Sequence, residues 1–182
     1  MFDELMQHGI GGSGGDNIKS IQRGSFLDNK SKNQTVDISE IDLSKSICLI
    51  EYDYPRTTMG VSSTQSMLSI DFLNNTQIVI RRASEGSALS SDIRLIHWTV
   101  VEFNNVKSLQ RGSISSSSSG RIVAITPVNM QKSLIFCSSQ GSPSGSMSSA
   151  IQAYAVFQDN SNVEIYPKAD YYIVNWQIVE FK

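Results

Sequence analysis

Two octets decide the fold of this chain: IKSIQRGS at residues 18–25 and VKSLQRGS at residues 106–113. They differ only by exchanges among isoleucine, leucine and valine, so the apolar or polar character of every position is kept. Internal repetition of this kind indicates that one structural unit occurs twice in a chain. The octets are therefore the first sign of a duplication.

Three further pairs of matching segments keep the same order along the chain. LSKSICLIEY (43–52) matches MQKSLIFCSS (130–139), IDFLNNTQIVI (70–80) matches AVFQDNSNVEI (155–165), and HWTVVEF (97–103) matches NWQIVEF (175–181). The spacing between partners changes from pair to pair, so the gaps fall between the segments, where loops are expected. We predict repeat one at residues 18–103, a linker at residues 104–105 and repeat two at residues 106–182. Each repeat is long enough for a small core of its own.

Both repeats are predicted to consist of β-strands. Short apolar or alternating runs such as ICLIEY (47–52) and RIVAITPV (121–128) are separated by turn-forming residues. FLNNTQIVI (72–80) and FQDNSNVEI (157–165) have the form of hairpins with polar, Asn-rich turns. Helical periodicity is nearly absent after residue 17. We therefore predict an all-β fold of two tandem duplicated antiparallel β-sandwich domains, each with about six strands, preceded by a short N-terminal arm.

The closing segments carry the residues that we expect in the structural core. Alternation along NWQIVEF (175–181) places bulky apolar side chains on both faces of a strand, as burial on both sides requires. Its Trp176 and Phe181 match Trp98 and Phe103 of repeat one. We expect these four residues in the structural core, and we interpret the two tryptophans as anchors that close the two sandwiches. For the two tryptophans, a sugar-stacking role is the alternative.

The composition is that of a globular protein with few charges. Hydrophobic residues make up 40% of the chain and charged residues 18%, and the net charge is −2. The basic residues are scattered and do not form the clustered stripe that grips phosphate, so we expect no direct contact with nucleic acid. No apolar run approaches the length of a transmembrane helix, and no secretory signal is visible in the first residues. We expect no membrane contact and synthesis in a cytoplasm.

Groups for catalysis or metal binding are sparse. The chain has two histidines, His8 and His97, and the position that matches His97 is Asn175. No cysteine and histidine cluster has the spacing of a metal site. GSPSG (141–145) and GIGGSG (9–14) have the letters of a nucleophile elbow and of a dinucleotide fingerprint, but they lack the strand–turn–helix context that those motifs need. We expect no enzyme activity, no catalytic residues, no metal and no cofactor.

The two cysteines, Cys48 and Cys137, lie in apolar runs of different repeats. A disulfide between them would have to cross the boundary between the two domains. Because free cysteine behaves as a small hydrophobic residue, we predict two buried free thiols.

Residues 1–17 precede the repeats and differ from them. Phe2, Leu5 and Met6 fall at helical spacing, and a glycine-rich tether that contains Ile10 follows. These four are the residues of the arm that we expect to bind a partner, by docking on a neighbouring subunit. A frayed terminus is the alternative.

The repeats resemble a known class of proteins in how they open and close. Small duplicated sandwiches that begin with IKSIQRGS (18–25) or VKSLQRGS (106–113), and end with WTVVEF (98–103) or WQIVEF (176–181), resemble proteins of tailed bacteriophage particles. The resemblance implies a non-enzymatic virion structural protein of the head, neck or tail. It also implies synthesis in the cytoplasm of a bacterial host, contacts with other virion proteins, and a homo-oligomer within the particle.

A fainter similarity to H-type lectin-like sandwiches leaves a second function open. It rests on SIQRGS (20–25) and SLQRGS (108–113) as opening strands, and on IHWTVVEF (96–103) and IVNWQIVEF (173–181) as closing strands. The protein would then bind a glycan or receptor on the host surface as a module of a phage tail or fibre. No sugar-site motif matches, so no lectin residue is transferred to this chain. Aromatic residues near loop carboxylates suit sugar stacking, and Tyr52 and Tyr54 in YDYPR (52–56) are the candidates, with YPKADYY (166–172) as a second such segment.

Overall fold

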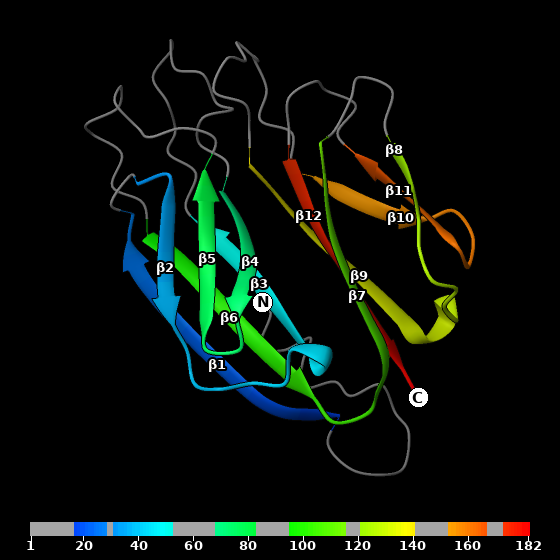
Figure 1. The fold of residues 1–182 in the computed structure, drawn as a ribbon, viewed down its shortest axis with the longest axis horizontal. Coiled ribbons are helices and arrows are strands. Elements are labelled where there is room, and N and C mark those ends of the chain that lie inside the picture. The colour runs from blue at the N-terminus through cyan, green and yellow to red at the C-terminus, as the bar shows by residue number, and fades with distance from the viewer. Residues whose placement is uncertain are drawn as a thin grey trace.

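The computed structural model describes residues 17–28, 31–52, 68–82, 95–115, 121–140, 153–166 and 173–182. Within these ranges the chain forms β-strands and two short 3₁₀ turns, and no α-helix occurs (Figure 1). The structure therefore confirms the predicted all-β fold with two duplicated domains. The predictions for Phe2, Leu5, Met6, Ile10 and Tyr54 lie outside the described residues.

Repeat one consists of two three-stranded antiparallel sheets. Its strands are β1 (Ile18–Leu27), β2 (Asn33–Asp37), β3 (Ser46–Tyr52), β4 (Leu68–Asn74), β5 (Gln77–Arg82) and β6 (Leu95–Phe103), with a 3₁₀ turn, η1 (Leu43–Lys45), before β3. Sheet A has the order β1-β6-β3, and sheet B has the order β2-β5-β4. The predicted hairpin over 72–80 is confirmed as the antiparallel pair β4 and β5.

Repeat two has the same topology, strand for strand. Its strands are β7 (Val106–Ser115), β8 (Arg121–Ala124), β9 (Ser133–Gln140), β10 (Tyr154–Phe157), β11 (Asn162–Tyr166) and β12 (Ile173–Phe181), with η3 (Met130–Lys132) before β9. Sheet C has the order β7-β12-β9, and sheet D has the order β10-β11-β8. Strands β7 to β12 therefore correspond to β1 to β6, and the registers of the pairs give each residue a partner in the other repeat.

Each repeat has a hydrophobic core between its two sheets. In repeat one the buried core residues are Ile41, Cys48, Leu68, Ile70, Ile78, Ile80, Ile96 and Val100. In repeat two they are Ile125, Val128, Val163, Ile165, Val174, Trp176 and Ile178. Alternation along each strand of sheets A and C directs one set of side chains into these cores and leaves the other set on an outer face.

The polar residues of the repeated octet bind the glutamate of the closing strand. Glu180 is 1% exposed and accepts hydrogen bonds from Lys107 at 2.8 Å, Ser108 at 3.0 Å and the backbone N–H of Asn129 at 2.9 Å. These contacts hold the pKa of Glu180 below its ordinary value of 4.5, and the hydrogen bond from Lys107 has the largest effect. The matching Glu102 binds the corresponding groups of repeat one. The octet and the closing strand are thus repeated together because they form one buried network.

The glycine of the octet is required by the tryptophan of the closing strand. A Cβ atom on Gly112 would lie 2.5 Å from Cζ2 of Trp176, and one on Gly24 would lie 2.5 Å from Cζ2 of Trp98. Both contacts are closer than a side chain can approach the indole. Each octet therefore has glycine where the indole crosses the neighbouring strand.

Candidate protein-docking surfaces

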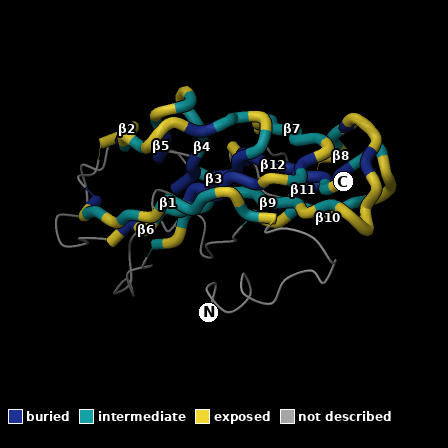
Figure 2. The backbone as a smooth tube through the Cα atoms, turned by 90° about the horizontal axis from the view of Figure 1, so that it is seen from below, coloured by how far each residue is buried: buried dark blue, intermediate teal, exposed yellow. Residues whose placement is uncertain are grey.

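The two repeats pack against each other through different surfaces. The outer face of sheet C, which points away from sheet D, lies against the edge of repeat one that is formed by β3 and β4. Figure 2 shows this edge turned toward repeat two, with buried segments of β3 and β12 near the centre of the molecule. The contact is heterologous, because a sheet face of one repeat meets a sheet edge of the other.

Gln177 of β12 caps the open edge of β3. Its side-chain carbonyl accepts the backbone N–H of Cys48 at 3.1 Å, and its amide donates to the Cys48 carbonyl at 2.8 Å. Gln177 is 6% exposed and Cys48 is 1% exposed, so these groups are shielded from water. An unpaired edge strand is a site for uncontrolled association, and a side chain that satisfies its backbone closes it.

Ser138 and Asn175 close the edge of β4 in the same manner. The Ser138 hydroxyl accepts the backbone N–H of Ile70 at 3.1 Å, and the Asn175 amide donates to the Ile70 carbonyl at 3.4 Å. Three polar side chains from the outer face of sheet C thus pair with the backbone of two edge strands.

Arg111 of β7 completes the contact at the η1 turn. Its guanidinium donates to the backbone carbonyls of Leu43 and Ser46 and lies 5.0 Å from the centre of the Phe72 ring. A cation over an aromatic face adds a further attraction. Arg111 is the arginine of the second octet, so an octet residue binds repeat one directly.

An apolar cluster at the junction holds the two repeats together. Its buried members are Ile47, Val101, Phe103, Val106 and Val179, and Phe181 packs against them. The rings of Phe103 and Phe181 meet edge to face with their centres 5.2 Å apart. Because residues of both repeats share this cluster, the tandem domains are joined by a core of their own.

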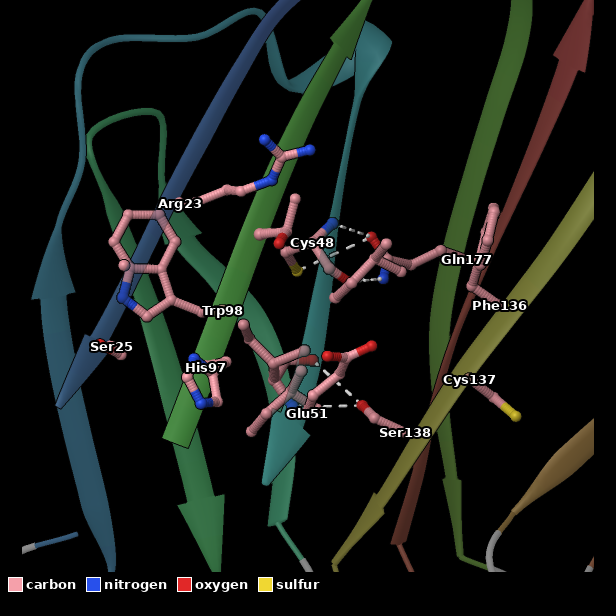
Figure 3. A pocket seen from close by; sticks show the side chains of 15 residues that line it. Arg23, Ser25, Cys48, Glu51, His97, Trp98, Phe136, Cys137, Ser138 and Gln177 are labelled. Carbon is pink, nitrogen blue, oxygen red and sulfur yellow. Dashed lines mark hydrogen bonds between the residues drawn. The ribbon is translucent and has the colours of Figure 1, made fainter. Parts of the chain in front are cut away.

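A groove of about 800 Å³ lies beside this junction, on the outer face of sheet A. Arg23, Ser25, Leu49, Glu51, His97 and Thr99 supply side chains from sheet A, while Phe136, Ser138 and Gln177 come from repeat two. Figure 3 shows the two sides of the groove, with Gln177 reaching across to Cys48. Arg23, Glu51 and His97 are exposed there.

The edge of repeat two that corresponds to the covered edge of repeat one is exposed. We call its four exposed hydrophobic side chains, on η3, β9 and β10, the open edge: Met130, Leu134, Tyr154 and Val156. Leu134 is 44% exposed, whereas its counterpart Ile47 is 0% exposed. Tyr154 is 52% exposed, whereas its counterpart Ser69 is fully buried and donates to Gln140 of repeat two. Leu134 and Tyr154 are therefore exposed in repeat two at positions that are covered in repeat one.

The residues predicted from the sequence lie in different environments. Trp176 is buried in the core of repeat two, whereas Trp98 is half-buried and borders the groove. Phe103 and Phe181 belong to the junction between the repeats rather than to the core of either sandwich. Tyr52 packs against the core of repeat one, and its hydroxyl accepts the backbone N–H of Leu68 at 3.2 Å.

The two cysteines are free thiols, as predicted. Cys48 is buried, and burial raises its pKa. Cys137 is only partly buried, and burial raises its pKa to about 11. They do not occupy matching positions, because Cys48 pairs with Val100 in sheet A while Cys137 pairs with Trp176 in sheet C.

The described ranges contain no group of three or more His, Cys, Asp or Glu side chains that could hold a metal ion. In the same ranges there is no helix with the length and apolarity needed to cross a membrane. The chain matches no protein-family model, and comparison with the curated proteins and with the solved structures gives no match either.

The docking residues Gln177, Asn175 and Ser138 were not identified from the sequence. A signal for them exists in the alignment of the two repeats. The aligned residues of repeat one are Thr99, His97 and Glu51, which are of different types. Matched strands that differ at outward-facing polar positions indicate surfaces whose surroundings differ within the chain.

Proposed function

We propose that this protein is a non-enzymatic structural component of a bacteriophage particle, in the head decoration, neck or tail. It would act by binding other proteins through its sandwich surfaces and its N-terminal arm. The observation that carries the proposal is the open edge of repeat two, an apolar sheet edge whose counterpart in the same chain is covered by protein.

The chemistry of the open edge favours a protein partner. Sheet edges left in water are commonly protected by charged side chains, proline or bulges. Here the edge presents Met130, Leu134, Tyr154 and Val156 instead. Complete burial of side chains of this size is worth roughly 1.5–3 kcal/mol each, which favours a partner that covers several of them at once.

The resemblance described above supports the virion assignment. A component made in the host cytoplasm and then incorporated into a particle needs surfaces that become buried on assembly. The low charge of the chain suits such packing against protein.

Incorporation into particles tests the proposal. Leu134→Lys places a charge on the open edge, and Ile122→Lys is the matched control, because Ile122 is a 68% exposed aliphatic residue on β8, a different edge of repeat two. In cells that produce the particles, the Ile122→Lys protein should be incorporated and the Leu134→Lys protein should remain free. Normal incorporation of Leu134→Lys would contradict the proposal.

Glycan binding is a second candidate, favoured by one observation. Tyr154 and Tyr166 stack with ring centres 4.6 Å apart and planes 7° apart, and Tyr154 is 52% exposed. Such a ring can stack on a sugar. A glycan array probed with the parent and with Tyr154→Ala tests it: loss of a specific signal in the variant would support a host-surface module of a tail or fibre.

A further inference from the structure

The chain contains one occupied docking contact and both halves of a second one. In the occupied contact, the outer face of sheet C receives the β3–β4 edge of repeat one. The corresponding face in repeat one is the sheet A wall of the groove, and the corresponding edge in repeat two is the open edge. Within one chain these two surfaces belong to different repeats: β9 borders the groove through Phe136 and Ser138, while Leu134 of the same strand is 44% exposed.

We propose that the open edge of one copy docks into the sheet A groove of a second copy, by the contact that already joins the two repeats within the chain. The inference rests on the proposed function, because it names the partner of the same edge. Repetition of a heterologous contact produces a head-to-tail assembly, which forms a ring if the rotation closes and a filament if it does not.

The groove contains an arginine equivalent to the one that binds the β3–β4 edge in the contact between the repeats. Arg23 corresponds to Arg111, which donates to the Leu43 and Ser46 carbonyls. In the second contact, Arg23 would donate to the backbone carbonyls of Met130 and Ser133 in the other copy. It would also lie over the ring of Phe157, which corresponds to Phe72.

Two of the three remaining polar positions also match the backbone that would enter, whereas Thr99 stands where Gln177 caps the edge of β3. Ala155 corresponds to Ile70, so its N–H and carbonyl point away from β11, just as those of Ile70 point away from β5. Glu51 replaces Ser138 as the acceptor for that N–H, and His97 replaces Asn175 as the donor to that carbonyl. Each replacement keeps the direction of the hydrogen bond.

The apolar part of the contact is complementary as well. Leu134 would take the place of Ile47, which is buried in the junction cluster beside Val179. Val101, the counterpart of Val179, is itself fully buried in that cluster, so in the second contact Leu134 would instead lie at Leu49, which lines the groove. Met130 would take the place of Leu43 at the turn before the edge strand. The open edge therefore has an aliphatic side chain at both positions where the covered edge has one.

The mass of the purified full chain in solution tests the inference. The monomer has a mass of 20.1 kDa. At concentrations up to about 1 mM, at which even weak association is detected, the mass of the parent protein should correspond to two or more copies of the chain. Glu51→Lys in the groove and Leu134→Lys on the open edge should each weaken association by about tenfold or more. Ile122→Lys should associate like the parent, and thermal unfolding should show that all three variants are folded.

Mixing the two variants tests the head-to-tail arrangement. The Glu51→Lys chain keeps an intact edge, and the Leu134→Lys chain keeps an intact groove. Their equimolar mixture should therefore form mixed pairs although each variant alone is monomeric. A symmetrical contact through either surface alone would not be restored in this way, so a mixture that stays monomeric would overturn the inference.

Two further outcomes would identify a different partner for the groove or for the open edge. If the parent is monomeric but a chain without residues 1–17 associates, the arm occupies the groove and the inference is overturned. If the parent is monomeric in both forms, yet its incorporation into particles still depends on Leu134, another virion protein covers the open edge. That result would overturn the inference and leave the proposed function standing.

Discussion

Replacing Gln177 with alanine should uncap the edge of β3. The variant loses two hydrogen bonds, of 3.1 and 2.8 Å, to the backbone of Cys48, which is 1% exposed. A buried backbone group left without a partner costs about 1–3 kcal/mol, so two such groups predict a loss of roughly 2–6 kcal/mol in the free energy of unfolding. The lower value applies if water enters the space left by the side chain.

Urea unfolding measures this loss, with the fluorescence of Trp98 and Trp176 reporting on the two repeats. With a slope of about 2 kcal/mol per molar urea, the midpoint of Gln177→Ala should fall by about 1–3 M. The matched control is Thr99→Ala at the corresponding position of repeat one, where Thr99 is half-buried; we expect a loss of less than about 1 kcal/mol. Equal midpoints for Gln177→Ala and the parent would refute the reasoning.

Three other predictions concern the interior. Gly112→Ala should destabilise the protein by about 1–3 kcal/mol in urea, because its Cβ would lie 2.5 Å from the Trp176 indole; an unchanged midpoint would contradict the packing described. Because the pKa of Glu180 is lowered when folded, its ion pair stabilises the protein fully above pH 4.5, and that contribution is lost as the pH falls through the lower folded value. Midpoints measured across this range should fall less steeply for Glu180→Gln than for the parent. Cys48 should resist thiol reagents until the protein unfolds, whereas rapid labelling of Cys48 in the native state would show that it is accessible.

The duplication, the all-β class and the hairpins could be predicted from the sequence because their signals are local, whereas the pairing of β1 with β6 and of β7 with β12 joins distant segments and was not predicted. Hydrophobic alternation and the Asn-rich turns indicated the strands and hairpins. The match between the octet and the closing strand reflects one buried network around Glu102 and again around Glu180. Alternation also placed Trp176 and Phe181 on opposite faces of β12, where the structure has them in different clusters.

The contact between the repeats could not be predicted, because it depends on how two nearly identical units are placed. Alternation shows that Gln177 and Asn175 face outward, but it does not show that a strand edge lies opposite them. For the same reason Leu134 and Ile47 have similar surroundings in the sequence, although one is 44% exposed and the other 0%. Phe103 and Phe181 were expected in the structural core, and the sequence did not show that this part of the core joins the two repeats.

A structure of the associated protein, determined at the concentration where its mass exceeds 20.1 kDa, tests the central claim most directly. We predict that the β9–β10 edge of one copy lies on the outer face of sheet A of the next, with the Arg23 guanidinium at the carbonyls of Met130 and Ser133. Copies that meet through other surfaces, with Leu134 still exposed and the groove uncovered, would contradict it.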